Sequence, residues 1–179
     1  MNLEVLAVTM NQNDDSLYKS MNIRSDVVFA NQCDRNEVVT TNVDGNRVTM
    51  VSTTTRGVGL NRNLALMYAS GDILLCADDD IIYNNDYKEQ VISAFENNPK
   101  ADVLVFSIAY TKDGEVFRVK KNKNKRLRLW QVFKYGTCVV AFRRSSILRV
   151  RQYFTLLFGG GCKYSSGEDS LFLLDCIRN

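Results

Sequence analysis

The sequence predicts a single α/β domain over residues 1–179, with a mixed, mainly parallel central sheet flanked by helices. Short apolar runs alternate with helical segments along the chain, the order expected of parallel strands joined by crossover helices. The run Ile73–Ala77 contains no charged or strongly polar residue, so we expect a strand buried on both faces. A chain of 179 residues also fits one domain with a substantial core.

Composition and charge agree with an ordinary globular domain. Hydrophobic residues make up 45% of the chain and charged residues 24%, both common values. The formal net charge of +3 is too small to predict nucleic-acid binding. The five cysteines are scattered without a Cys-x-x-Cys pair, which favours a reducing compartment. Neither a secretory signal nor a membrane-spanning apolar run is visible, so we expect a cytoplasmic protein.

The first part of the chain predicts strands, a short helix and a hairpin. Leu3–Val8 and Asp26–Ala30 are expected strands, with a helix between them. A strand–helix–strand order implies a right-handed parallel unit. Val38–Val43 and Val48–Ser52 then form a hairpin around Asp44-Gly45, a dipeptide suited to a tight turn.

The next stretch predicts an amphipathic helix before the buried strand. Leu60, Leu64 and Met67 recur at i, i+4 and i+7, which places them on one helical face. We expect Gly71 to end this helix in the left-handed conformation, which glycine adopts without a Cβ penalty.

Three successive carboxylates, Asp78, Asp79 and Asp80, directly follow the strand. Ligands of open α/β sheets bind beyond the carboxyl ends of the strands, and like charges crowded there favour a cation. A solvated acidic turn is the alternative. Because the chain has no His, a histidine-based zinc or iron site is excluded. An EF-hand loop fails at Ile82 and Tyr83, so we favour a cation completed by a diphosphate.

The rest of the chain predicts further helices and strands. A helix over Asp86–Asn97 is ended by Asn98-Pro99. Strands are expected over Asp102–Tyr110 and Gly136–Phe142, and a last helix over Asp169–Arg178.

A basic run, Lys120–Arg128, lies between the two expected strands. Like-charge blocks are usually solvated loops. The alternative is contact with an anionic acceptor such as a lipid diphosphate, or peripheral contact with a membrane surface. Trp130 and Phe133 follow the run, and they fit an interfacial contact and a protein core equally well.

Two motifs together carry a family resemblance. The run RGVGLNRN at residues 56–63, followed by the acidic triplet, resembles the core of family 2 glycosyltransferases with the GT-A fold and its DxD-type motif. About 90 residues later, Ser166–Asp169 resembles the Glu-Asp motif that supplies that family's catalytic base. The resemblance implies a GT-A-like domain that moves a sugar, with inversion, from a UDP- or GDP-sugar to a glycan or lipid-linked acceptor in bacterial polysaccharide synthesis. Family members continue past this motif, which implies a chain incomplete at its carboxyl end.

The resemblance also implies roles in catalysis and metal binding. Asp169, and secondarily Glu168, would be the catalytic base. Asp80 would chiefly hold Mg²⁺ or Mn²⁺, with Asp78 near the ribose or a metal-bound water. Arg62 would lie near the diphosphate, whose oxygens match a guanidinium fork; a solvated helix arginine is the alternative.

Further positions would bind the nucleotide. The resemblance implies that the end of the first strand, Thr9 and Asn11, and a pair after the second strand, Asn31 and Gln32, hold the base and ribose beside Asp79. Amides stand where the family has an acidic pair, and an amide offers both a donor and an acceptor to a base edge. The identity of the nucleobase therefore stays open.

Other functions are compatible with parts of the pattern. Gly57-x-Gly59 imitates a dinucleotide-binding fingerprint, but Arg62 stands where the third glycine is needed. A nucleotidyltransferase would also use acids and a metal, but a Gly-rich basic loop after the first strand is missing. A non-catalytic or degenerate module that binds a nucleotide or an anionic glycan or lipid remains an alternative.

Overall fold

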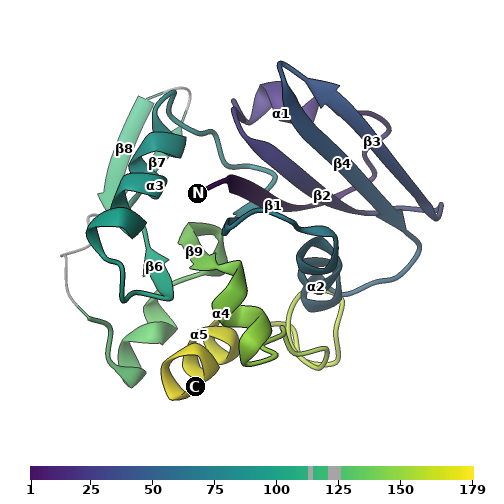
Figure 1. Ribbon diagram of the computed structural model, residues 1–179. Helices are drawn as coiled ribbons and strands as arrows, with labels where there is room; N and C mark the ends of the chain where they lie inside the picture. The colour runs from purple at the N-terminus through teal and green to yellow at the C-terminus, as the bar shows by residue number, and fades with distance from the viewer. Residues whose placement is uncertain (113–114, 121–125) are drawn as a thin grey trace.

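The computed structural model describes residues 1–112, 115–120 and 126–179 (Figure 1). Its strands are β1 (Leu3–Met10), β2 (Asp26–Gln32), β3 (Glu37–Val43), β4 (Asn46–Thr53), β5 (Ile73–Asp78), β6 (Val103–Val105), β7 (Ile108–Lys112), β8 (Glu115–Lys120) and β9 (Val140–Arg143). Its helices are α1 (Leu17–Ser20), α2 (Val58–Tyr68), α3 (Tyr87–Asn97), α4 (Arg144–Arg149) and α5 (Glu168–Arg178), with 3₁₀ helices η1 (Leu129–Lys134) and η2 (Thr137–Val139).

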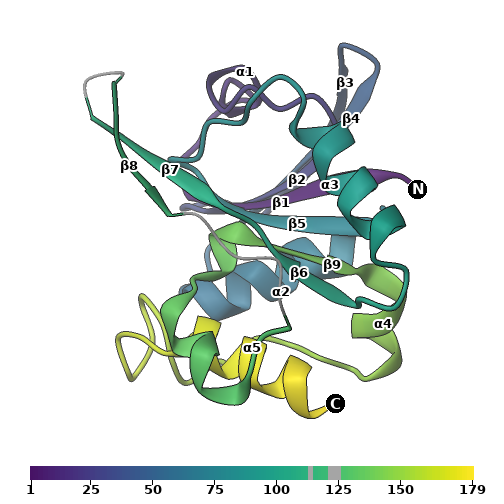
Figure 2. The same ribbon diagram turned by 90° about the vertical axis from the view of Figure 1, so that its left-hand side faces the viewer.

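A seven-stranded sheet with the order β3-β4-β2-β1-β5-β9-β6 forms the centre of the molecule. Strands β4, β2, β1 and β5 are parallel neighbours. Strand β3 pairs antiparallel with β4, and β9 pairs antiparallel with both β5 and β6. The prediction of a mixed, mainly parallel α/β sheet is confirmed. A separate two-stranded sheet, β7-β8, projects beside it (Figure 2).

Helices cover both faces of the central sheet (Figure 2). Helices α1 and α3 lie on one face, and α2, α4 and α5 lie on the other. Residues Leu3, Val5 and Ala7 of β1 pack toward the first pair of helices, whereas Leu6 and Val8 pack toward the second group. This alternation follows from the two-residue period of a strand, and it explains why both faces of β1 are apolar.

The hairpin β3-β4 forms around the predicted turn. Asp44 and Gly45 both have positive φ, 52° and 80°, and Val43 pairs directly with Asn46. Positive φ at both central residues is what a two-residue hairpin turn of this type requires, so this prediction is confirmed.

Helix α2 buries a different face from the one predicted. Met67 is 71% exposed, and the buried face instead carries Asn61, Arg62, Ala65 and Leu66. The hydrophobic pattern was misleading because two polar side chains are buried through hydrogen bonds to the sheet and to carboxylates. A helix face that is buried partly through polar side chains cannot be located from the spacing of hydrophobic residues.

The end of α2 also differs from the prediction. The helix ends at Tyr68, and the next residue is already extended. Gly71 has no positive φ; it is needed because a Cβ there would lie 2.7 Å from the Cβ of Glu4. Glycine at this position provides room for a neighbouring strand.

The two strands expected in the second half are shorter than predicted. The segment 102–110 is divided between β6 and β7, which belong to different sheets. The segment 136–142 begins as η2 and becomes strand β9 only at Val140. As a result, a helical turn rather than a strand end approaches the amino terminus of α5.

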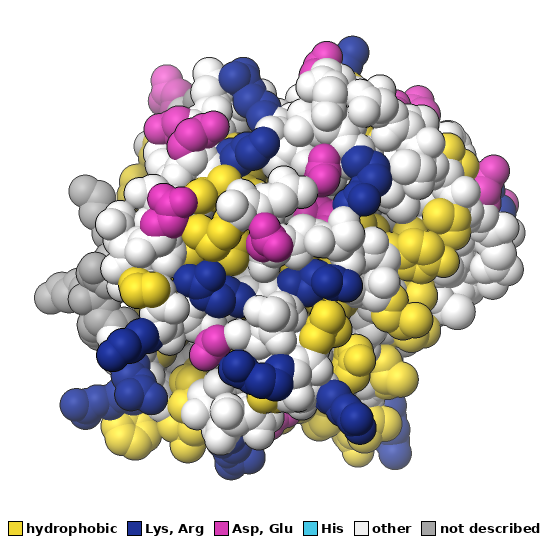
Figure 3. Space-filling view, in the orientation of Figure 1, with side chains coloured by type: hydrophobic (Ala, Val, Ile, Leu, Met, Phe, Trp, Pro, Cys, Tyr) yellow, Lys and Arg dark blue, Asp and Glu magenta, His cyan; other side chains and the backbone are white. Residues whose placement is uncertain are grey.

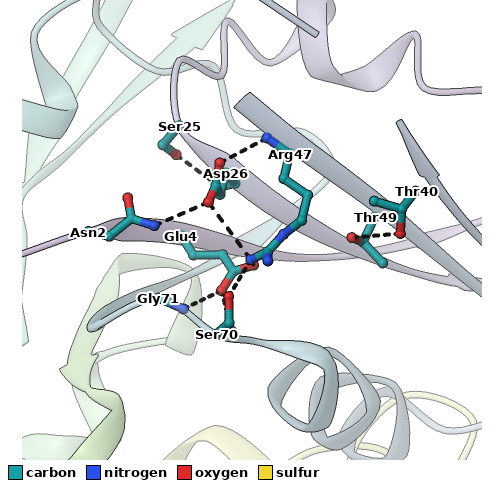
Figure 4. Close-up of polar contacts among 9 residues, drawn as sticks. All are labelled: Asn2, Glu4, Ser25, Asp26, Thr40, Arg47, Thr49, Ser70 and Gly71. Atoms are coloured by element: carbon teal, nitrogen blue, oxygen red, sulfur yellow. Dashed lines mark hydrogen bonds and ion pairs between the residues drawn. The ribbon is translucent and has the colours of Figure 1, made fainter. Parts of the chain in front are cut away.

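A buried carboxylate secures the edge of the sheet where β1 begins (Figure 4). Glu4 has no exposed surface. Its Oε2 accepts hydrogen bonds from the backbone N–H groups of Ser70 and Gly71 at 2.6 and 2.7 Å, and its Oε1 accepts one from Arg47 at 2.9 Å. Because its charge is paired and hydrogen-bonded, Glu4 joins β1, β4 and the α2–β5 turn.

Candidate active site

The carboxyl ends of β1, β2 and β5 meet at one edge of the sheet. In the register of these strands, Val8 lies opposite Asp78 and Thr9 lies opposite Asn31. This edge is opposite to the one that Glu4 secures, since the three strands are parallel. It is the position at which open α/β sheets bind ligands.

Arg62 of α2 links three carboxylates at this edge. Its Nη1 donates to Glu168 Oε1 at 3.0 Å and to Asp169 Oδ1 at 2.6 Å. Its Nη2 donates to Asp78 Oδ1 at 3.1 Å. The side chain is 8% exposed, and the guanidinium lies 5.5 Å from the ring centroid of Phe154. Arg62 therefore joins the acidic triplet to the Glu-Asp motif in one cluster.

Burial and neighbouring charges act against each other in this cluster. Burial alone would lower the pKa of Arg62, but Asp169 and Asp78 raise it above its usual value. Burial raises the pKa of Asp78, although Arg62 partly opposes this effect. Three carboxylates share one guanidinium, so the cluster retains an excess of negative charge that an added cation would reduce.

Asp169 has one oxygen that is fully hydrogen-bonded and one that is open. Oδ1 accepts from Arg62 and, at 2.7 Å, from the hydroxyl of buried Thr137 in η2. Within the described part of the chain, Oδ2 accepts no hydrogen bond. Gly136 faces it, since a Cβ at that position would lie 3.4 Å from Oδ2. The Asp169 side chain as a whole is 27% exposed.

Glu168 is held in a tighter environment. It is 9% exposed, and a Cβ on Gly159 would lie 2.8 Å from its Cδ and 2.5 Å from Val58 Cγ1. Gly159 has a φ of 106°, so both its conformation and its lack of a side chain are needed there. Glu168 is less accessible to a substrate than Asp169.

Two asparagines of α2 fix the surroundings of the cluster. Asn61 donates to the carbonyl of Ala30 at 2.6 Å and so ties α2 to the end of β2. Asn63 donates to the carbonyl of Phe154 at 2.9 Å and accepts from its N–H at 2.8 Å. The Phe154 ring is thereby held beside Arg62.

Of the predicted nucleotide-binding residues, Thr9 and Asn11 lie at the same edge. The hydroxyl of Thr9 donates to Asp79 Oδ2 at 2.6 Å, which connects the first strand to the acidic triplet. Asn11 is exposed and has a φ of 56°, and its N–H donates to the carbonyl of Gln32 at 2.9 Å. These residues line the end of the parallel strands.

Asn31 and Gln32 are buried and make hydrogen bonds within the protein. The Asn31 amide donates to the Gln12 carbonyl at 2.9 Å and accepts from the Gln12 N–H at 3.0 Å. Gln32 donates to the carbonyl of Gly57 at 3.0 Å. Both amides therefore shape the loops that border the site, and neither presents an open side chain at its surface.

The acidic triplet offers ligands for a hard cation without forming a complete cage. Within the described residues, no group of three or more His, Cys, Asp or Glu side chains is arranged to hold a metal ion. Asp80 is exposed, and the Asp78 side chain is 42% exposed. Two carboxylates of this kind fit Mg²⁺ or Mn²⁺ if a substrate supplies the remaining oxygens.

Sequence reasoning missed three residues that shape the cluster. Thr137 was not singled out, because an isolated threonine in an apolar run is typical of a strand. Phe154 has the character of any core residue. Asn61 lies in a helix whose buried face was predicted from hydrophobic residues alone. Their roles depend on contacts between segments that are far apart in the sequence.

The basic run lies largely outside the described residues. Of the stretch Lys120–Arg128, residues 121–125 fall in the undescribed part, whereas Arg126 and Arg128 are exposed. Trp130 and Phe133 are each 67% exposed, which decides against a core position for them. Among the described residues, none of the helices is long and apolar enough to cross a membrane.

Comparison with known proteins gives one family and one group of similar structures. The family model described as "Glycosyl transferase family 2" matches residues 21–152. The crystal structure of S. aureus TarS 1-349 superposes with a TM-score of 0.66 at 19% identity, covering 96% of this chain and 54% of that one. TarS 1-349 in complex with UDP-GlcNAc gives 0.65 at 20% identity, covering 96% and 52%. The expected GT-A-like fold is thus confirmed.

The extent of these matches is limited. The chain spans about half the length of the TarS 1-349 structures. TarS 1-349 in complex with UDP also matches, at 19% identity and a TM-score of 0.65. No curated protein matches by sequence.

Proposed function

Because this chain belongs to glycosyl transferase family 2, we propose that it is an inverting glycosyltransferase that moves a sugar from a nucleoside-diphosphate sugar to an acceptor hydroxyl. Residues 1–179 would form its nucleotide-sugar-binding catalytic domain. The observation that carries the proposal is the cluster around Arg62, which brings Asp78 and Asp169 to one guanidinium. Sugar transfer needs an acid that helps to bind the donor and a base that contacts the acceptor, and the two must lie close enough to act on one pair of substrates.

The proposed donor is a UDP-sugar, with a GDP-sugar as the alternative. TarS 1-349, which shares this fold, has been crystallised with UDP-GlcNAc and with UDP. In this chain the diphosphate would lie over the ends of β1 and β5, where Thr9 orients Asp79. Asn31 and Gln32 would act indirectly, by holding the loops against which the base and ribose pack.

Asp169 is the proposed general base. Its Oδ2 takes the proton of the acceptor hydroxyl while that oxygen forms a bond to the anomeric carbon. The bond from this carbon to the diphosphate breaks at the same time, and its electron pair leaves with the nucleoside diphosphate. Attack from the face opposite the leaving group inverts the anomeric centre. Glu168 would assist by holding Arg62 in place.

Asp80 and Asp78 are the proposed ligands of Mg²⁺ or Mn²⁺. When bound, such a cation would stabilise the negative charge of the departing diphosphate as a Lewis acid. Burial destabilises the ionised form of Asp78 and raises its pKa, so a cation bound there would have to offset this cost by stabilising the carboxylate. Arg62 donates its hydrogen bonds to three carboxylates of the protein, which favours a positioning role over direct binding of the diphosphate.

The proposed acceptor is a glycan or a lipid-linked glycan in bacterial polysaccharide synthesis, with the reaction in the cytoplasm. The family membership supports a glycan acceptor in general terms. The five cysteines are all unpaired, which supports a reducing compartment.

The test is thermal unfolding with UDP and GDP, each with and without Mn²⁺. A ligand at a hundredfold excess over its Kd stabilises the native state by about 2.7 kcal/mol, which is readily measured. A shift with one nucleotide that requires Mn²⁺ and is lost in Asp80→Ala, but kept in Asp169→Asn, would support the proposal. If neither nucleotide shifts the transition with Mn²⁺ present, the proposed donor site is wrong.

A further inference from the structure

Positive charge is concentrated in one part of the chain. Of its 23 Lys and Arg residues, thirteen lie between residues 116 and 167, a stretch that contains no Asp or Glu. All 20 acidic residues therefore lie outside this stretch, so the small overall net charge conceals a strong separation of sign. Such a separation of charge along the chain favours contact of this segment with anionic partners.

Two large aromatic side chains project from the same positive segment. Trp130 and Phe133 are each 67% exposed, whereas Val132 between them is completely buried. They belong to η1, and in a 3₁₀ helix the side chains at i and i+3 lie above one another. Trp130 and Phe133 therefore share one face of η1, and Val132 anchors the opposite face in the core.

Basic and apolar side chains form one exposed surface here, which we call the basic aromatic surface. Figure 3 shows Lys and Arg side chains beside hydrophobic ones at the lower left of the molecule. The surface consists of six exposed residues: Arg126, Arg128, Leu129, Trp130, Phe133 and Lys134.

We propose that the basic aromatic surface docks on an anionic lipid bilayer. Positive charges complement anionic headgroups, and each basic residue near such a surface strengthens binding about fivefold. Tryptophan favours the headgroup level, where its ring is apolar and its N–H remains wet. An anionic glycan would pair with the arginines, but it offers no apolar interior into which the two exposed aromatic rings could insert. The combination of charge and apolar insertion is typical of peripheral membrane contacts.

The basic aromatic surface lies close in the chain to the proposed acceptor side. Helix η1 leads through Tyr135 to Gly136, whose position faces Asp169 Oδ2. A bilayer at this surface would present a lipid-linked acceptor near that oxygen. This consequence rests on the proposed function, whereas the docking itself does not.

Vesicle binding of the intact chain tests the proposal without any nucleotide. Trp130 is the only tryptophan, so its fluorescence reports on this surface alone. With vesicles of phosphatidylcholine and phosphatidylglycerol we expect sedimentation of the protein, a blue shift of Trp130 emission, and quenching by brominated acyl chains. Phosphatidylcholine alone should bind much more weakly.

Variants separate the two contributions. Phe133→Ser removes an apolar contact and keeps the fluorescent probe, and we expect about tenfold weaker partitioning. The pair Arg126→Gln and Arg128→Gln should lose about fivefold for each charge. The matched control is Lys19→Gln with Arg24→Gln, which removes the same charge from exposed positions at α1 and just after it; it should bind as the parent does. Circular dichroism confirms that each variant is folded.

Several outcomes would overturn the docking proposal. Sedimentation without a blue shift or quenching of Trp130 would mean that another surface binds. Equal loss in the control pair would mean that only overall charge matters. Binding to a soluble polyanion with the same Trp130 response would assign the surface to a polymer instead. None of these results bears on nucleotide binding, so the proposed donor site is tested separately.

Discussion

The hydroxyl of Thr137 donates a 2.7 Å hydrogen bond to Oδ1 of Asp169, the same oxygen that Arg62 contacts at 2.6 Å. Two donors on one oxygen distinguish the two oxygens of this carboxylate. Oδ1 is engaged in fixing the side chain, and Oδ2 lies beside Gly136. The proposal that Asp169 is the general base can therefore be made for a single atom, Oδ2.

Asp169→Asn should lower kcat by about 10²–10⁴-fold, the usual contribution of a general base. The amide keeps nearly the same shape, so nucleotide binding should be retained. The measurement is transfer to the acceptor, together with thermal unfolding in the presence of UDP and Mn²⁺. Glu168→Gln is the control, and we expect a smaller loss because Glu168 is buried beside Gly159. Near-native transfer by Asp169→Asn would remove this residue from the base role.

Thr137→Val should lower kcat about tenfold while leaving KM for the donor unchanged. The substitution preserves shape but removes one hydrogen bond to a charged group, a contact of about 1.5–3 kcal/mol. Asp169 would then rotate more freely and present Oδ2 less often. Thr137→Ser restores the donor and should recover most of the activity. A merely structural role for Thr137 would lower stability in both variants without this recovery, so urea unfolding is measured alongside.

Most of the fold was predictable, because burial on both faces leaves apolar runs such as Ile73–Ala77 that mark parallel strands. The Asp44-Gly45 turn was predictable because its backbone angles restrict the residues that fit. The cluster around Arg62 was predictable only in part. The two acidic motifs are visible in the sequence, but the arginine that joins them is 106 residues from Glu168.

The remaining differences have a common physical cause. The buried face of α2 carries Asn61 and Arg62, whose burial depends on partners in distant strands and in α5. That Asn31 binds nucleotide stays a prediction, but the partners of its amide, Gln12 and Ser52, could not be predicted either. The spacing of hydrophobic residues indicates which apolar side chains favour burial. It does not indicate which polar side chains find hydrogen-bond partners in the interior.

Asp78 should make nucleotide binding sensitive to mild acid. Burial raises the pKa of Asp78, and a cation requires the ionised carboxylate. Affinity for UDP with Mn²⁺ should therefore fall as the pH decreases through this raised pKa, at a higher pH than for an ordinary aspartate. Calorimetric titration at a series of pH values measures it. Asp79→Asn should show the same pH dependence as the parent, whereas Asp78→Asn should bind weakly at every pH.

Asp78 should also make the free energy of unfolding depend on pH in the absence of ligand. A carboxyl whose folded pKa is raised stabilises the fold most when protonated, below its unfolded pKa, and this contribution is lost as the pH rises through the folded pKa. The free energy of unfolding of the parent, relative to Asp78→Asn, should therefore decrease with rising pH in that window. Urea unfolding of both proteins gives this difference. A constant difference across the acidic range would contradict the assignment.

Arg62→Met should be among the most destabilising substitutions at the site. The guanidinium is 8% exposed and pairs with Glu168, Asp169 and Asp78, so its removal leaves partly buried carboxylates without a counter-charge. Breaking a buried pair in this way typically costs about 3–5 kcal/mol.

Arg62→Lys should recover only part of this loss, because one ammonium cannot match the fork that reaches both the Glu-Asp motif and Asp78. Arg35→Met is the control at a more accessible site: Arg35 pairs with Glu37 and donates to the Gln12 carbonyl at 2.8 Å, so we expect a smaller loss of about 1–2 kcal/mol. The free energy of unfolding in urea measures all three. If Arg62→Met were as stable as Arg35→Met, the carboxylates would not depend on Arg62 for their pairing. Full activity in that variant would likewise show that the acidic triplet and the Glu-Asp motif act independently of it.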